Sequence, residues 1–182
     1  MCIRGVCVFA VTVLASGPSN VGAAGDVHFR GTTSCYIDYK DTHKLRPDEA
    51  YYEPLTDVEV NVVAPEQVKD VSKPGKDKEG RDVASYKFSV SPGPPVCVLY
   101  HHPTSDKGFV PVLKSLSGES NRRQQVHVTL LTKRQYIDRF GEEILKADME
   151  QLYRKLKQLK VDEGTLRTIR DHLQTKLRVS VE

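Results

Sequence analysis

The densest group of side chains that could do chemistry is Tyr100-His101-His102-Pro103. Tyrosine and histidine side chains can bind a metal ion or transfer a proton, so this group would suit a small metal-dependent enzyme. The surrounding residues predict a strand, however, and successive side chains of a strand point to opposite faces of its sheet. His101 and His102 then cannot share a metal ion without a bend. A metal-dependent enzyme centred on Tyr100, His101 and His102 is therefore only the alternative function.

Other catalytic patterns are missing from the sequence. It contains no G-x-S-x-G motif, no H-E-x-x-H motif and no glycine loop that would hold a phosphate. The neighbouring carboxylates Glu142-Glu143 stand beside lysines in a stretch with helical periodicity, which is typical of a solvated helix face. We therefore assign no catalytic residue and expect no metal or other cofactor.

The first 24 residues have the layout of a secretory signal peptide. Arg4 gives a basic start, Val6–Ala15 is an apolar run, and small residues follow at Val21–Gly25. The run is too short to span a bilayer, which takes about 20 residues. We expect cleavage near residue 24 and a secreted or periplasmic protein without a membrane span.

Two cysteines follow the predicted signal peptide, and both fall in predicted strands. An oxidising compartment would favour one disulfide between Cys35 and Cys97. Two free thiols, buried as small apolar side chains, are the alternative.

The region before residue 132 alternates short β-type runs with turn-forming clusters. In Ala84–Tyr100, the apolar residues Tyr86, Phe88 and Val90 alternate with polar ones, and Pro92-Gly93-Pro94-Pro95 then predicts a turn. Regularly spaced strands of this kind indicate a small antiparallel β-sandwich. The charged stretch Lys73–Asp82 is expected to be a solvated loop. The predicted strands are Val27–Tyr39, Val58–Val63, Ser85–Val90, Val96–His101, Phe109–Leu113 and Gln125–Leu131.

Helical periodicity replaces the alternation after Leu131. One apolar stripe, extended at its start by Tyr136, Ile137, Phe140 and Ile144, consists of Leu145, Met149, Leu152, Leu156 and Leu159. Asp162 is a candidate N-cap for a second helix that carries Leu166, Ile169, Leu173 and Leu177. We expect an amphipathic helical hairpin. Its first stripe is longer than the second helix can cover, so the excess should contact the sandwich, a second copy or a protein partner.

The charge balance gives no indication of a nucleic-acid partner. Of 27 basic side chains only Arg4 lies in the signal region, which leaves 26 basic against 24 acidic side chains, a net charge of about +2.

The β region also resembles a known family. Pro54–Val60, followed by Ser85–Val98 with its Pro-Gly turn, is similar to the carboxypeptidase regulatory-like domain, and Gln125–Leu131 fits its closing strand. The resemblance covers about residues 27–131 and leaves the helical region unaccounted for. It implies a transthyretin-like sandwich that serves as an accessory, folding or binding module, without catalytic residues.

These observations predict three parts: a signal peptide over residues 1–24, a transthyretin-like β-sandwich over 25–132 and an amphipathic helical hairpin over 133–182. The expected function is non-enzymatic binding or assembly outside the cytoplasm, through the helical stripe. A carbohydrate-binding module is a further alternative, although the chain has no Trp to stack on a sugar ring.

Overall fold

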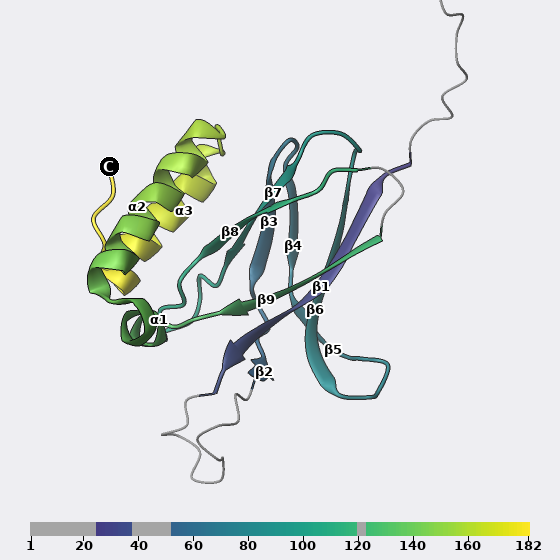
Figure 1. Ribbon diagram of the computed structural model, residues 1–182, viewed down its shortest axis with the longest axis horizontal. Coiled ribbons are helices and arrows are strands. Elements are labelled where there is room, and N and C mark those ends of the chain that lie inside the picture. The colour runs from purple at the N-terminus through teal and green to yellow at the C-terminus, as the bar shows by residue number, and fades with distance from the viewer. Residues whose placement is uncertain (1–24, 38–51, 120–122) are drawn as a thin grey trace, which may run out of the picture.

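The structure of the protein is a computed structural model, which describes residues 25–37, 52–119 and 123–182. The predicted signal peptide lies outside the described residues. Two sheets with mainly antiparallel strands are followed by three helices at the C-terminal end (Figure 1). The coarse fold prediction, β structure followed by helices, is therefore confirmed.

The larger sheet, sheet A, has five strands and is built around β1 (Val27–Tyr36). β1 pairs antiparallel with β6 (Asp82–Val90) and, over its last three residues, with β2 (Tyr52–Pro54). Its other edge pairs with β9 (Arg123–Leu130), and this ladder is parallel. β5 (Lys73–Lys76) pairs with the far edge of β6.

The smaller sheet, sheet B, is antiparallel throughout. Its order is β4 (Val68–Val71), β3 (Glu59–Ala64), β7 (Val96–His101) and β8 (Val112–Leu116). β4 and β8 are therefore its two edge strands.

The two sheets enclose one apolar core, because their strands present every second side chain to it. β6 buries Ala84, Tyr86, Phe88 and Val90 and exposes the residues between them. β7 is buried at all six positions, since sheet A covers one of its faces and the helices cover the other. Among the buried residues between the sheets are Val27, Phe29, Val60, Val62, Val96, Val98, Tyr100, Val128 and Leu130.

The strand predictions are accurate where the alternation is strong and fail where it is weak. The predicted bounds Val96–His101 match β7, whereas β8 begins and ends three residues later than Phe109–Leu113. The stretch Lys73–Asp82 is not wholly a loop, because Lys73–Lys76 forms β5. Lysine and proline are typical of edge strands, whose outer backbone groups stay in water.

Each helix begins at a recognisable cap. Thr132 caps α1 (Lys133–Phe140) in a capping box with Gln135. Gly141, with φ of 93°, then ends α1 and precedes α2 (Glu142–Gln158). The single long first helix that the stripe predicts is thus divided in two. The predicted cap Asp162 is confirmed, because its side chain accepts a hydrogen bond from the backbone N–H of Thr165 at the start of α3 (Glu163–His172).

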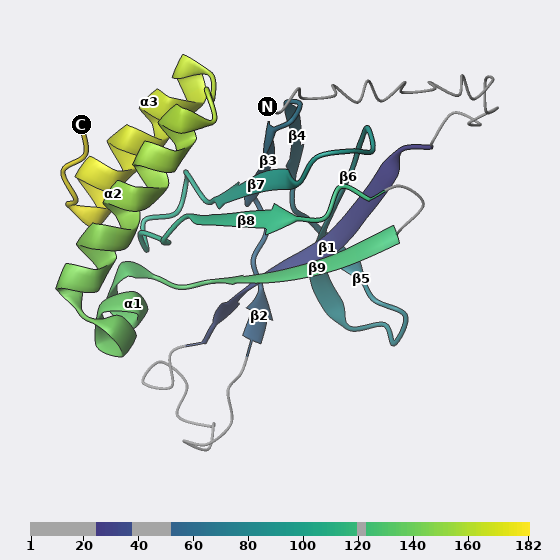
Figure 2. The same cartoon turned by 45° about the horizontal axis from the view of Figure 1, so that its top comes forward.

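The helices lie on the outer face of sheet B, and α3 lies beside α2 (Figures 1 and 2). A second apolar cluster fills this interface. From sheet B it includes Val63, Cys97 and Leu99, and a π-helical turn, Leu173–Leu177, continues α3 into it. From α2 it takes Leu145, Met149, Leu152, Tyr153 and Leu156. The helices therefore complete the fold as a third layer.

No helix within the described ranges is both long enough and apolar enough to cross a membrane.

Candidate functional site

The Tyr100–His102 group does not form a single site. The Tyr100 side chain is buried between the sheets, and its hydroxyl lies 2.9 Å from that of Tyr86. His101 is buried on the opposite face of β7, with its ring centroid 4.5 Å from that of His172 in α3. His102 follows the strand and stacks on Phe109, with 5.4 Å between ring centroids. The three side chains diverge, as expected of a strand.

Burial keeps the side chains of His101 and His172 uncharged at neutral pH. Burial, together with the nearby His172 and His102, lowers the pKa of His101 to about 3. Burial also lowers the pKa of His172, whose Nε2 lies 2.8 Å from the carbonyl oxygen of Phe109. The Nε2 atom of His101 has no hydrogen-bond partner in the described part of the chain. At neutral pH this pair therefore packs α3 against sheet B as uncharged rings.

Over residues 25–37, 52–119 and 123–182, no group of three or more His, Cys, Asp or Glu side chains is arranged to hold a metal ion.

The predicted disulfide is not formed: Cys35 and Cys97 are both free and buried. Cys35 belongs to the core between the sheets, whereas Cys97 belongs to the cluster beneath the helices. Sheet B separates the two thiols, because Cys97 points away from the inner face of β7 that carries Val96 and Val98. The alternative, two buried thiols, is the arrangement in the structure.

The helical stripe that was expected to bind a partner is turned inward. Leu145, Met149, Leu152 and Leu156 are at most 8% exposed, and Leu159 is partly buried against the same cluster. Of the three contacts left open for the excess apolar surface, the structure shows the one with the sandwich, through the partly buried Tyr136 and Ile137. Phe140 and Ile144, predicted to extend the stripe, are instead about half exposed, at 52% and 49%.

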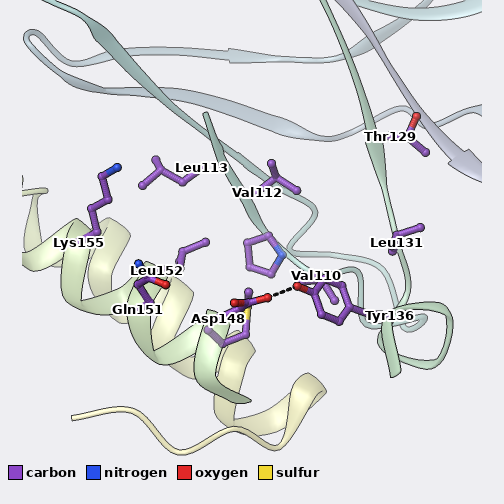
Figure 3. Close-up of a pocket in the computed structure, with 12 residues that line it drawn as sticks. Val110, Val112, Leu113, Thr129, Leu131, Tyr136, Asp148, Gln151, Leu152 and Lys155 are labelled. Carbon is purple, nitrogen blue, oxygen red and sulfur yellow. Dashed lines mark hydrogen bonds between the residues drawn. The ribbon is translucent and has the colours of Figure 1, made fainter. Parts of the chain in front are cut away.

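A groove lies between the sandwich and the helices and is the candidate site (Figure 3). It has a volume of about 360 Å³ and lies between β8, the end of β9, α1 and α2. Its walls are mainly apolar. They include Val110, Val112 and Leu113 around the start of β8, Leu131 just after β9, and Met149 and Leu152 of α2.

Two unpaired strand edges open beside this groove. β8 pairs only with β7, and β9 pairs only with β1, among the strands that the structure describes. The backbone N–H of Val110 donates to the carbonyl oxygen of Leu131 at 2.8 Å, which ties the two segments together before β8 begins. Beyond that point the edges separate, and Val112, Leu116 and Val126 are only partly buried against the core. The open side thus presents unpaired backbone next to accessible apolar side chains.

The charged groups that line the groove are one carboxylate and one ammonium group. The hydroxyl of Tyr136 donates a hydrogen bond to the carboxylate of Asp148 (Figure 3). Burial and this carboxylate raise the pKa of Tyr136 to about 12, so the hydroxyl keeps its proton. Lys155 extends from α2 at the other end of the groove (Figure 3) and forms no ion pair with a described residue. The carboxylate keeps its negative charge, and the ammonium group has no ion-pair partner among the described residues.

Sequence reasoning missed this groove, since it depends on which strand edges stay unpaired. A faint signal was the lysine at position 114, which lies between the apolar residues Val112 and Leu116 of the same strand face.

Comparison with known proteins gives no match: no family model, no curated protein and no solved structure is significantly similar to this chain.

Proposed function

We propose that this chain is a non-enzymatic protein-binding module, which receives an extended segment of a partner protein along the free edge of β8. The observation that carries the proposal is the position of the apolar groove directly beside two unpaired strand edges. The helical layer contributes α2 as one wall of the groove. The proposed binding site is thus the groove between the sandwich and the helices, whereas the sequence had indicated the helical stripe.

The chemistry of strand addition explains why such a site binds protein. An exposed strand edge offers a row of backbone donors and acceptors that an extended chain can match. Main-chain hydrogen bonds then supply affinity, and the pockets for alternate side chains supply specificity. In this groove the apolar pocket is formed by Val112 and Leu113 on one side and by Leu152 of α2 on the other.

The metal-dependent enzyme has less support, because the Tyr100, His101 and His102 side chains diverge into three different environments. The carbohydrate-binding alternative would depend on exposed aromatic rings. Tyr36 and Tyr52 are candidates for stacking on a sugar, but their rings lie against each other, with centroids 4.6 Å apart, so each covers part of the other.

Export and the transthyretin-like identity of the sandwich belong to the same proposal. Export is supported by the basic start, apolar run and small residues of the first 24 positions. The family resemblance is supported by the two facing sheets and by the β6–β7 turn at Pro92–Pro95.

An array of random decapeptides, probed with the full chain, tests the proposal. Gln151 lies on the exposed side of α2 and lines the groove, so Gln151→Trp should fill the groove without disturbing the core. Gln158→Trp is the matched control, because Gln158 is exposed on the same helix and lines a different hollow. We expect the array to select peptides with alternating apolar residues, and their binding to be lost in Gln151→Trp but retained in Gln158→Trp.

Failure of the array to select any peptide, or equal binding by both tryptophan variants, would overturn the proposal. Sedimentation of the wild-type chain distinguishes a partner from a second copy. A dimer that dissociates in Gln151→Trp would mean that the segment bound in the groove comes from another copy of this chain.

A further inference from the structure

The edge strand β8 carries a charge on the face where its neighbours are apolar. In the ladder with β7, Lys114 pairs with Val98, between the pairs Tyr100–Val112 and Val96–Leu116. The β7 members of these pairs, Val96, Val98 and Tyr100, are fully buried between the two sheets. Paired residues of a ladder present their side chains to the same face, so Lys114 starts from the core-facing side of β8.

The environment of Lys114 leaves its ammonium group available. The side chain is half-buried, which lets its methylene stem lie along the apolar edge while the charged end reaches water. No carboxylate in the described part of the chain lies within ion-pair distance of it.

A second cation, Lys155, belongs to α2 and lines the groove beside this edge. Lys155 of α2 also lacks an ion pair among the described residues, and the carboxylate of the groove, Asp148, accepts a hydrogen bond from the hydroxyl of Tyr136 and keeps its negative charge. The groove itself therefore carries one charge of each sign, and Lys114 adds a positive charge at the free edge of β8. This arrangement complements an acidic ligand.

From this we infer that the groove selects extended segments with an acidic residue flanked, two positions away on each side, by apolar residues. The inference rests on the proposed function and specifies its partner. In a strand added to β8, residues opposite Val112 and Leu116 would face the core and favour apolar side chains. The residue opposite Lys114 would lie on the same face, where a carboxylate would pair with the ammonium group. The same lysine would oppose pairing between two β8 edges, since like charges directly opposite each other repel.

Three synthetic strand-length peptides test this selectivity. Each consists of threonines with two valines, placed two positions before and after a central residue, which is glutamate, glutamine or lysine. Fluorescence anisotropy with the full chain should give a dissociation constant about tenfold lower for the glutamate peptide than for the glutamine peptide, and the weakest binding for the lysine peptide. Lys114→Gln should bring the glutamate and glutamine peptides to similar affinities. Lys114→Glu should make the lysine peptide the strongest.

Lys87→Glu is the matched control, because Lys87 is an exposed strand lysine on the outer face of sheet A and its substitution changes the net charge equally. It should leave the order of the three peptides unchanged. Similar unfolding curves for the Lys114 variants and the wild type would show that they fold.

The outcomes separate this inference from the proposed function. Equal binding of the three peptides, still lost in Gln151→Trp, would overturn the charge selection and leave the groove as the binding site. The selection is also wrong if none of the three binds while array peptides do, or if Lys87→Glu changes the order as Lys114→Glu does. If the array also selects nothing, both proposals fall.

Discussion

Gly31 leaves room for the carbonyl oxygen of Val126: a Cβ atom on Gly31 would lie 1.7 Å from that oxygen. The two residues pair in the parallel ladder of β1 and β9. The same oxygen accepts a hydrogen bond of 2.7 Å from the hydroxyl of Tyr86 in β6, on the other side of β1. Tyr86 in turn accepts from Tyr100 of sheet B. The missing side chain of one glycine thus lets a buried hydrogen-bond chain connect both sheets.

Gly31→Ala should therefore destabilise the fold strongly. The new methyl group would displace Val126 and break the bond to Tyr86, which we expect to lower the free energy of unfolding by about 3 kcal/mol or more. Urea unfolding followed by circular dichroism measures this change. Gly75→Ala, in β5, is the control, because its Cβ would meet the nearest atom at an ordinary 3.5 Å. Similar midpoints for the two variants would contradict the close approach of β1 and β9.

Acid should weaken the contact between α3 and sheet B. The pKa of His101 is about 3 in the folded chain and about 6.5 when unfolded. The unfolded state therefore binds more protons between these values, and stability falls as pH decreases from about 6.5 towards 3, by up to about 1.4 kcal/mol per pH unit for this group. The lowered pKa values of His102 and His172 act in the same direction.

The test is chemical denaturation from pH 7 to pH 4 for the wild type and for His101→Phe. The phenylalanine keeps a buried ring and removes one titrating group, so its stability should depend less on pH. An equally steep dependence in both proteins would show that His101 is not responsible.

The two buried thiols should react slowly. Burial, with the carboxylate of Glu53 nearby, raises the pKa of Cys35 to about 12, so its thiol stays protonated at neutral pH. Iodoacetamide followed by peptide mass spectrometry should label Cys35 and Cys97 in denaturant without reductant, and hardly at all in the native protein. Recovery of a peptide pair joined through these two cysteines would contradict the structure.

Shortening a buried side chain between the helices and sheet B should destabilise the fold. Leu156 is fully buried on the inner side of α2, so Leu156→Ala should lower the free energy of unfolding by about 2–5 kcal/mol. Ile144→Ala, at a half-exposed position of the same helix, should change stability little. Thermal melting monitored by circular dichroism compares them. Wild-type melting of Leu156→Ala would mean that the helices do not share a core with sheet B.

The sequence predicted the parts of the fold that local pattern determines. The alternation in β6 and the apolar run of β7 indicated strands, because burial of one or both faces dictates these patterns. Asp162 indicated a helix start, because its side chain satisfies a free backbone N–H. By contrast, β5 has the sequence Lys-Pro-Gly-Lys and no apolar pattern. It is a strand only because the edge of β6 is available to it.

The candidate site could not be predicted from local sequence patterns either, because it also depends on how the strands pair. The position of Lys114 on a core-facing edge depends on the β7–β8 register, and the groove depends on which strands stay unpaired. The division at Gly141 was also missed, since the apolar stripe continues through it and one glycine does not reveal its φ angle. Cys35 and Cys97 looked like partners because a sequence does not show which side of a sheet each thiol occupies.

The parallel ladder between β1 and β9 also has a consequence for the order of folding. It joins the first described strand to the last, with Cys35 paired to Leu130. During synthesis β1 can pair with β6 early, but its second edge has no partner until Leu130 has emerged from the ribosome. Contacts between such distant parts of a chain form slowly, because a long loop must first close. Until then β1 has one unpaired edge, so a nascent chain interrupted before β9 would expose that edge, and unpaired strand edges are prone to aggregation.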